Sequence, residues 1–119
     1  MTNSPKPQGP YSPAVVANGF VFVSGQIAVN PETGKLVESD ITVQTKQVME
    51  NLKMVLKTKG VSIKDVVKTG VFLKNPEELP AMNSVYETYF TDNKPARTIV
   101  PGVEWKPGVL IEIDAIATI

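Results

Sequence analysis

One arginine stands apart from every other cation in this chain. Of the 12 basic residues, 11 are Lys, and the single Arg is Arg97 in the stretch NKPARTIV. A guanidinium donates hydrogen bonds as a planar fork, so it grips a carboxylate or a phosphate at two points and stays charged when partly buried. Two hypotheses follow: Arg97 binds an anionic ligand, or it forms a structural ion pair with a neighbouring carboxylate. Composition alone does not choose between them.

A second candidate is Glu112, an acid within the apolar stretch IEIDAIA. Strand side chains alternate between two faces, so Glu112 and Asp114 share one face while Ile111, Ile113 and Ala115 take the other. A carboxylate in so apolar a strand can be placed for acid–base chemistry. Two acids on one face more often mark a surface that simply faces water.

Five further residues could line a site, and each has a simpler structural explanation. Ser24 and Gly25 could offer a hydroxyl and a close backbone approach to a ligand, or merely end a strand. Tyr11 follows a proline-rich segment and either packs on the body or lies over a pocket. Asn83 either reaches into a site or decorates a helix surface. Trp105 lies in a turn-rich stretch, where a Trp is usually an anchor or an interface residue.

The composition excludes several kinds of chemistry. The chain has no Cys and no His, which excludes disulfides, Cys-ligated zinc, cysteine nucleophiles and Ser-His-Asp triads. Its net charge is zero and no basic block occurs, so nucleic acid is not expected as a partner. No apolar run reaches the roughly 18 residues of a membrane span. The N-terminus lacks a signal core, so a cytoplasmic protein is expected, with a mitochondrial pool left open.

The elements that must position these residues follow from local patterns. At 119 residues the chain fits a single domain, 1–119. The expected elements are strands 14–17 and 20–26 joined by Asn18-Gly19, an extension over 27–29, a helix 40–59, a strand 66–73, a helix starting at Pro76 with Asn75 as its cap, a strand from Ala96 and a strand 109–119. This order predicts an α+β fold with two helices on one face of a mixed sheet.

Six stretches taken together resemble a known family, the RidA (YjgF) imine deaminases. In order along essentially the whole chain they are GPYSPAVVANGFVFVSGQIAVNPETG, TKQVMENLKMVL, DVVKTGVFLKN, MNSVYETYF, KPART and IEIDAIA. The resemblance implies a chorismate mutase-like fold whose three copies form a barrel-like homotrimer with a cleft at each subunit interface. It also implies hydrolysis of 2-aminoacrylate and 2-aminocrotonate, as their imine tautomers, to 2-oxo acids and ammonia, without a cofactor or a metal.

The resemblance assigns roles residue by residue. Arg97 would clamp the substrate carboxylate, and Glu112 would position the attacking water. The substrate-binding residues would be Tyr11, Ser24, Gly25, Asn83 and the backbone of Ile99. The chain departs from many relatives at Pro101-Gly102, which should interrupt a strand, and at Trp105, where Leu is common. These departures leave the substrate range open.

Two alternatives to catalysis remain at this point. A trimeric carboxylate-binding or chaperone-like protein would need Arg97 but not Glu112. Some relatives have been described as acting on RNA or translation, but the neutral charge and the absence of His weaken that reading.

Overall fold

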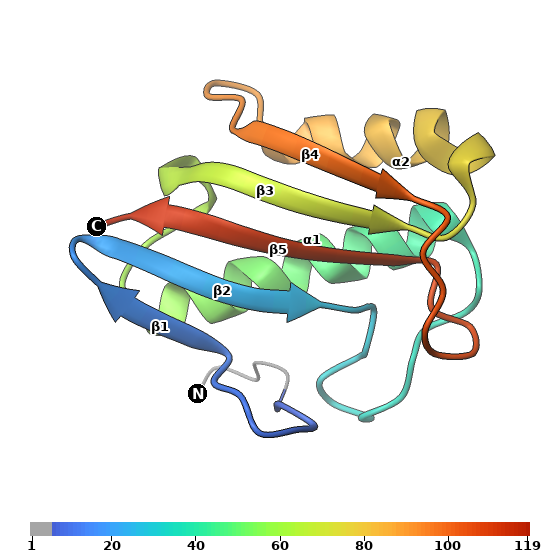
Figure 1. The fold of residues 1–119 in the computed structure, drawn as a ribbon, viewed down its shortest axis with the longest axis horizontal. Coiled ribbons are helices and arrows are strands. Elements are labelled where there is room, and N and C mark those ends of the chain that lie inside the picture. Colours follow the sequence, from blue (N-terminus) through green and yellow to red (C-terminus); the bar gives the residue numbers. More distant parts are fainter. Residues whose placement is uncertain (1–5) are drawn as a thin grey trace.

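Five strands and two α-helices follow the order expected from the sequence, in a computed structural model that describes residues 6–119 (Figure 1). The elements are β1 (Ala14–Ala17), β2 (Phe20–Gln26), α1 (Ile41–Thr58), β3 (Val66–Leu73), α2 (Leu79–Tyr86), β4 (Ala96–Pro101) and β5 (Ile111–Thr118). The sheet order is β1-β2-β5-β3-β4. Only β3 and β4 run parallel, joined through α2, so the sheet is mixed.

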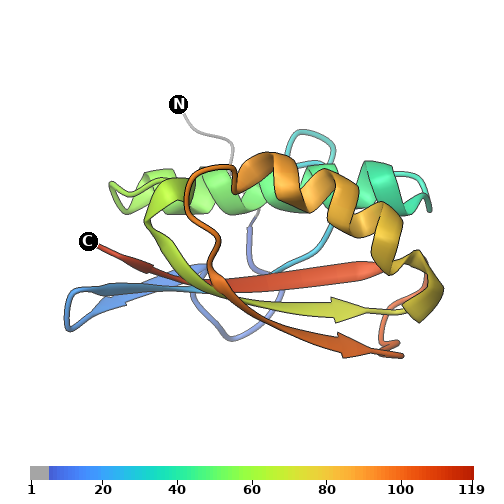
Figure 2. The ribbon, with the colours of Figure 1, turned by 90° about the horizontal axis from the view of Figure 1, so that it is seen from above.

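Both helices lie on one face of the sheet, as Figure 2 shows. The core lies between the layers, where the apolar stripe of α1 packs with the alternate residues of the central strands. Val48 and Leu52 of α1 and Val21 and Ile113 of the sheet are all fully buried. The expected α+β architecture with two helices on one face is therefore confirmed. Neither helix of residues 6–119 has the length and apolar character needed to cross a bilayer.

Local chemistry explains where several elements begin and end. Asn18 and Gly19 both have positive φ, 51° and 80°, the geometry that a two-residue hairpin requires. The Asp40 side chain accepts a hydrogen bond from the Val43 N–H at 3.0 Å and so caps α1. Strand β4 ends at Pro101, followed by Gly102 at φ 75°, as the sequence predicted.

The prediction that β2 continues over residues 27–29 was wrong, and contacts from α1 explain why. The Asn51 side chain donates to the carbonyl oxygens of Ile27 and Val29, at 3.1 and 2.8 Å. These carbonyls are therefore satisfied by a buried helix residue rather than by a neighbouring strand. Gln44, also on α1, has a similar effect at the start of β5. Its side chain accepts a hydrogen bond from the Leu110 N–H, so the strand expected from residue 109 begins at Ile111.

The second helix also begins differently from the prediction. Residues 76–78 form a 3-10 turn, and the α-helix starts only at Leu79. Asn75 makes no side-chain cap and instead donates to the Glu78 carboxylate at 3.1 Å. Glu78 is close enough to compete with the backbone for the short Asn side chain, so the expected cap is replaced by a side-chain pair.

Candidate functional site

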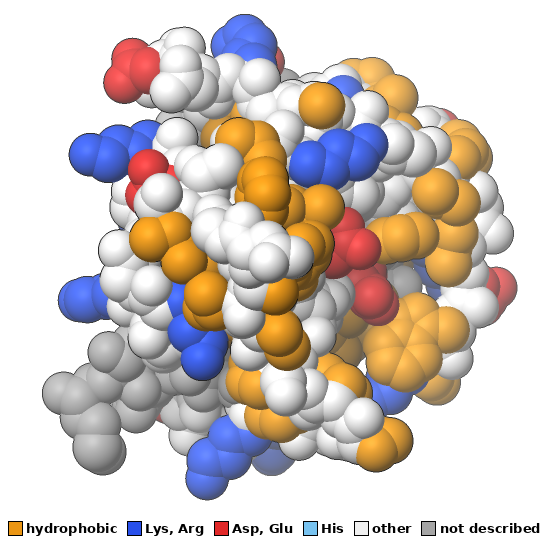
Figure 3. All heavy atoms as spheres, turned by 60° about the vertical axis from the view of Figure 1, so that its left-hand side comes forward, with side chains coloured by type: hydrophobic (Ala, Val, Ile, Leu, Met, Phe, Trp, Pro, Cys, Tyr) orange, Lys and Arg blue, Asp and Glu red, His pale blue; other side chains and the backbone are white. Residues whose placement is uncertain are grey.

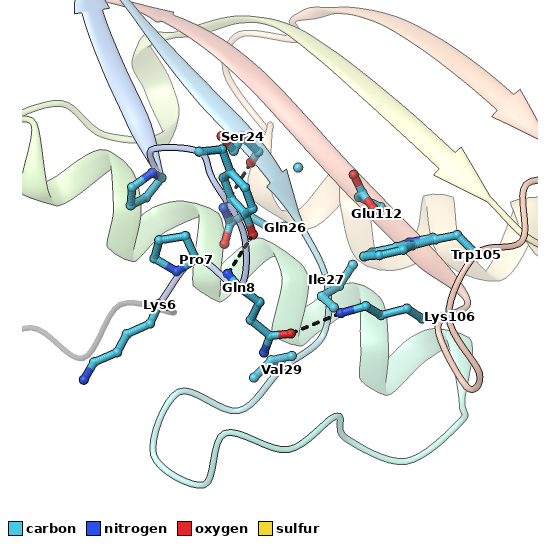
Figure 4. A pocket seen from close by; sticks show the side chains of 13 residues that line it. Lys6, Pro7, Gln8, Ser24, Gln26, Ile27, Val29, Trp105, Lys106 and Glu112 are labelled. Atoms are coloured by element: carbon cyan, nitrogen blue, oxygen red, sulfur yellow. Dashed lines mark hydrogen bonds between the residues drawn. The ribbon is translucent and has the colours of Figure 1, made fainter.

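Glu112 lies in a cavity of about 460 Å³ beside the end of β2 (Figure 4). Three segments form the walls: the N-terminal segment, the end of β2 and the loop between β4 and β5. The cavity brings together four of the site residues expected from the sequence: Tyr11, Ser24, Gly25 and Glu112. Trp105, also singled out from the sequence, lines the same cavity.

Position 25 needs a glycine because the Glu112 side chain lies directly over it. The register between β2 and β5 shifts between Val23 and Gln26, so Ser24 and Gly25 form an irregularity of the β-bulge kind in β2. A Cβ atom built on Gly25 would collide with Oε2 of Glu112 and lie 2.8 Å from its Cδ. The glycine thus makes room for a carboxylate of this chain. The sequence had suggested room for a ligand instead.

The surroundings of Glu112 favour its protonated form. Burial raises the pKa of the Glu112 carboxyl, and the negative charge of Asp114 on the same face raises it further. The Trp105 indole and the Lys106 ammonium act in the opposite direction and lower this pKa. The net shift is upward, which makes the ionised carboxylate a stronger proton acceptor.

Ser24 holds the N-terminal segment against the end of β2, and Tyr11 braces that segment internally. The Ser24 hydroxyl donates to the Ser12 carbonyl at 2.6 Å, and the Tyr11 hydroxyl accepts from the Gln8 N–H at 3.3 Å. The Tyr11 ring is exposed and lies along the cavity wall. Both residues shape the cavity by fixing its outer wall.

Arg97 lies in a second hollow of about 370 Å³ that includes Asn83 and Tyr86 of α2. Its Nη1 donates to Oδ1 of Asn83 at 2.8 Å, and its guanidinium lies 4.8 Å from the centre of the Tyr86 ring. No Asp or Glu of residues 6–119 forms an ion pair with Arg97. The structural ion pair considered from the sequence is therefore absent from the described chain. Asn83 and Tyr86 instead orient a guanidinium whose charge has no carboxylate partner there.

Ile99 lies two residues beyond Arg97 on the same strand, and its side chain packs against the core. Strand β4 is at the edge of the sheet and pairs only with β3. An edge strand leaves backbone groups on its outer side without a partner strand. The backbone of this stretch is therefore available to a ligand or to another chain.

Arg97 and Glu112 lie on opposite faces of the sheet. Arg97 is in register with Thr69, which is fully buried on the helix side. Glu112 is in register with Phe72, and its neighbours Ile111 and Ile113 are the ones that point into the core. Side chains on the two faces of one sheet cannot hold the same small molecule. A ligand that touches both groups must lie between two copies of this chain.

Two cavity residues escaped the sequence reasoning. Lys106 Nζ donates to Oε1 of Gln8 at 3.1 Å and ties the loop before β5 to the N-terminal segment. The two residues are far apart in the chain, and neither belongs to a recognisable motif.

No three acidic side chains of residues 6–119 come together as a metal site, and the chain has neither His nor Cys.

Comparisons with known proteins find relatives that match nearly the whole chain. The family model for Endoribonuclease L-PSP matches residues 1–119. A RutC family protein of Pyrococcus horikoshii is 49% identical over 115 residues, covering 97% of this chain and 91% of that protein. The Escherichia coli K12 protein named 2-iminobutanoate/2-iminopropanoate deaminase is 38% identical over 118 residues, covering 97% and 91%. The crystal structure of the E. coli YjgF gene product matches with a TM-score of 0.91 at 36% identity, covering 99% of this chain and 94% of that chain.

Proposed function

The chain belongs to the endoribonuclease L-PSP family, also called RidA or YjgF, and we propose that it is an imine deaminase. It hydrolyses the imine tautomers of 2-aminoacrylate and 2-aminocrotonate to 2-oxo acids and ammonia. The observation that carries the proposal is Glu112, a half-buried carboxyl with a raised pKa, held over Gly25 inside a cavity.

The proposed active site lies between two copies of the chain in a homotrimer. Arg97 and Glu112 are on opposite faces of the sheet, so each site takes one of them from each copy. The face without helices is apolar at Val15, Phe20 and Phe22, which are 52%, 39% and 43% exposed. Figure 3 shows hydrophobic side chains gathered in a band on this side of the molecule, beside acidic ones. Contact with other copies would remove this surface from water.

The reaction needs little beyond orientation and proton transfer. The Arg97 guanidinium of one copy clamps the substrate carboxylate with two hydrogen bonds. Glu112 of the other copy, in its ionised form, takes a proton from a water molecule as that water attacks the imine carbon. The same carboxyl gives this proton to the imine nitrogen, which leaves a tetrahedral carbinolamine with a hydroxyl and an amino group on one carbon. Glu112 then takes the hydroxyl proton and passes it to the amino group, so the C–N bond breaks, ammonia leaves, the hydroxyl oxygen becomes the carbonyl oxygen and the carboxylate is restored. An imine carbon is already electrophilic, so no metal or cofactor takes part in this proposal.

A coupled assay tests the proposal directly. A threonine dehydratase generates 2-aminocrotonate in situ, and its absorbance decay is followed with no protein, wild type, Arg97→Ala and Glu112→Gln. We expect wild type to speed the decay, Arg97→Ala to abolish the effect, and Glu112→Gln to slow turnover about 10²- to 10⁴-fold. A carboxylate-binding protein without turnover predicts no acceleration at all. Full activity in Glu112→Gln would refute the assigned role of this carboxyl.

Gly25→Ala is expected to damage activity far more than stability. The new Cβ would displace the Glu112 carboxylate, which can swing aside at small cost because it ends a flexible side chain. A displacement of about 1 Å in a catalytic group can cost about 10²-fold in rate. The measurements are kcat/KM and the thermal midpoint of unfolding. Gly34→Ala is the control: Gly34 has a φ of 72°, where alanine is strained, so this exchange should lower stability and leave kcat/KM unchanged. Unchanged kcat/KM would show that the placement of Glu112 over Gly25 is unimportant.

Asp114→Asn is expected to shift the pH profile toward acid. The Asp114 charge raises the pKa of Glu112, and Glu112 must be ionised to accept a proton from water. Removing the charge lowers this pKa, so the acid limb of kcat/KM moves to lower pH. The Asn keeps an oxygen for the Gly70 N–H, which Asp114 now accepts at 2.9 Å. A limb that stays in place, or moves upward, would mean that another group controls it. Glu104→Gln, at an exposed acid on the neighbouring loop, serves as the charge control.

A further inference from the structure

Trp105 forms a wall of the Glu112 cavity, and its indole also lowers the pKa of the Glu112 carboxyl. It is the only Trp of the chain, and 55% of it is exposed. Figure 4 shows its ring between the Glu112 carboxyl and the Lys106 side chain. The Lys106 ammonium lies 4.6 Å from the ring centre, and the same ammonium is tied to Gln8 of the N-terminal segment. The ring is therefore held in place from one side while its other side faces the cavity.

Other parts of the cavity wall are apolar. Ile27, Val29, Pro7 and Pro13 line the same cavity. Its volume of about 460 Å³ falls in the range of about 300–1,000 Å³ seen for sites that bury drug-sized ligands.

The direction of the substrate follows from the split site. The imine carbon must lie at Glu112, and its carboxylate must point out of the cavity toward Arg97 of the other copy. The other two substituents of this planar carbon, the nitrogen and the substrate side chain, then both lie on the side of the walls that this chain supplies. Trp105 is the largest side chain among those walls.

We propose that Trp105 is a specificity-determining residue that packs against the substrate side chain and favours imines with branched or longer apolar side chains over those with a methyl group. This inference rests on the proposed deaminase function. It is specific to this chain's loop between β4 and β5, where Lys106 and Gln8 fix the ring. Apolar contacts of this kind discriminate by about 10- to 200-fold per methylene group.

The kinetic test compares two imines generated in situ by a flavin-dependent amino-acid oxidase, one from alanine and one from leucine. Wild type is expected to show the higher kcat/KM with the leucine-derived imine. Trp105→Leu should lower the ratio of the leucine-derived to the alanine-derived kcat/KM about 10-fold, because any change in the pKa of Glu112 on losing the indole affects both imines alike. Glu104→Gln, an exposed neighbour on the same loop that does not line the cavity, should change neither. An unchanged ratio in Trp105→Leu would overturn the inference while leaving the deaminase proposal intact.

A binding test separates the inference from turnover. Because Trp105 is the only Trp, the emission of the wild-type protein reports on this cavity alone. Titration with 4-methyl-2-oxopentanoate and with pyruvate should give a dissociation constant about 10-fold lower for the branched 2-oxo acid. Equal constants, or emission that neither compound changes, would overturn the role of Trp105. Loss of all turnover in folded wild type would instead overturn the deaminase proposal, and the titration would still decide the role of Trp105.

Discussion

A one-to-one mixture of the two inactive variants Arg97→Ala and Glu112→Gln, refolded together, is expected to recover about one quarter of wild-type activity. Each proposed site takes Arg97 from one copy and Glu112 from its neighbour, because the two side chains lie on opposite faces of the sheet. In a random mixture half of the chains keep Arg97 and the other half keep Glu112. About one site in four then receives both intact groups.

The experiment has clear internal controls. Each variant refolded alone should remain inactive, and wild type carried through the same procedure sets the full value. Size-exclusion chromatography of each sample checks that the chains assemble equally. A mixture as inactive as its components, with normal assembly, would show that both groups act within one chain and would contradict the shared site.

Arg97→Lys is expected to lower kcat/KM about 100-fold although the charge is retained. Lys offers a point charge on a flexible stem, whereas the Arg fork holds a carboxylate at two points. The hydrogen bond to Asn83 and the Tyr86 ring also orient a planar guanidinium, and an ammonium would lose that orientation. Misplacement of a bound substrate by about 1 Å is enough for a loss of this size.

The measurement is steady-state kinetics on 2-aminocrotonate together with the thermal midpoint of unfolding. Stability should change little, because Arg97 is exposed in the single chain. Lys57→Arg, the reverse exchange at an exposed position of α1, is the matched control and should be neutral. Full activity in Arg97→Lys would show that charge alone suffices and that the fork geometry has no role.

Much of the fold followed from local sequence patterns. The Asn18-Gly19 turn and the helix expected over 40–59 each depend on patterns within one stretch of the chain, so they can be predicted without the rest of it. Patterns that depend on distant partners were misread. Residues 27–29 left the sheet because a side chain from α1, Asn51, satisfies their carbonyl groups.

The sequence by itself singled out Arg97 and Glu112, because one is the only Arg and the other is an acid in an apolar strand. It also determined that Glu112 and Asp114 share a face, since alternation within one strand is a local property. The opposite orientation of Arg97 and Glu112 emerges only when the strands are assembled into the sheet. The relation between two strands depends on register and on irregularities such as those at 23–26 and 66–68, and a shift of one residue reverses the face of every side chain.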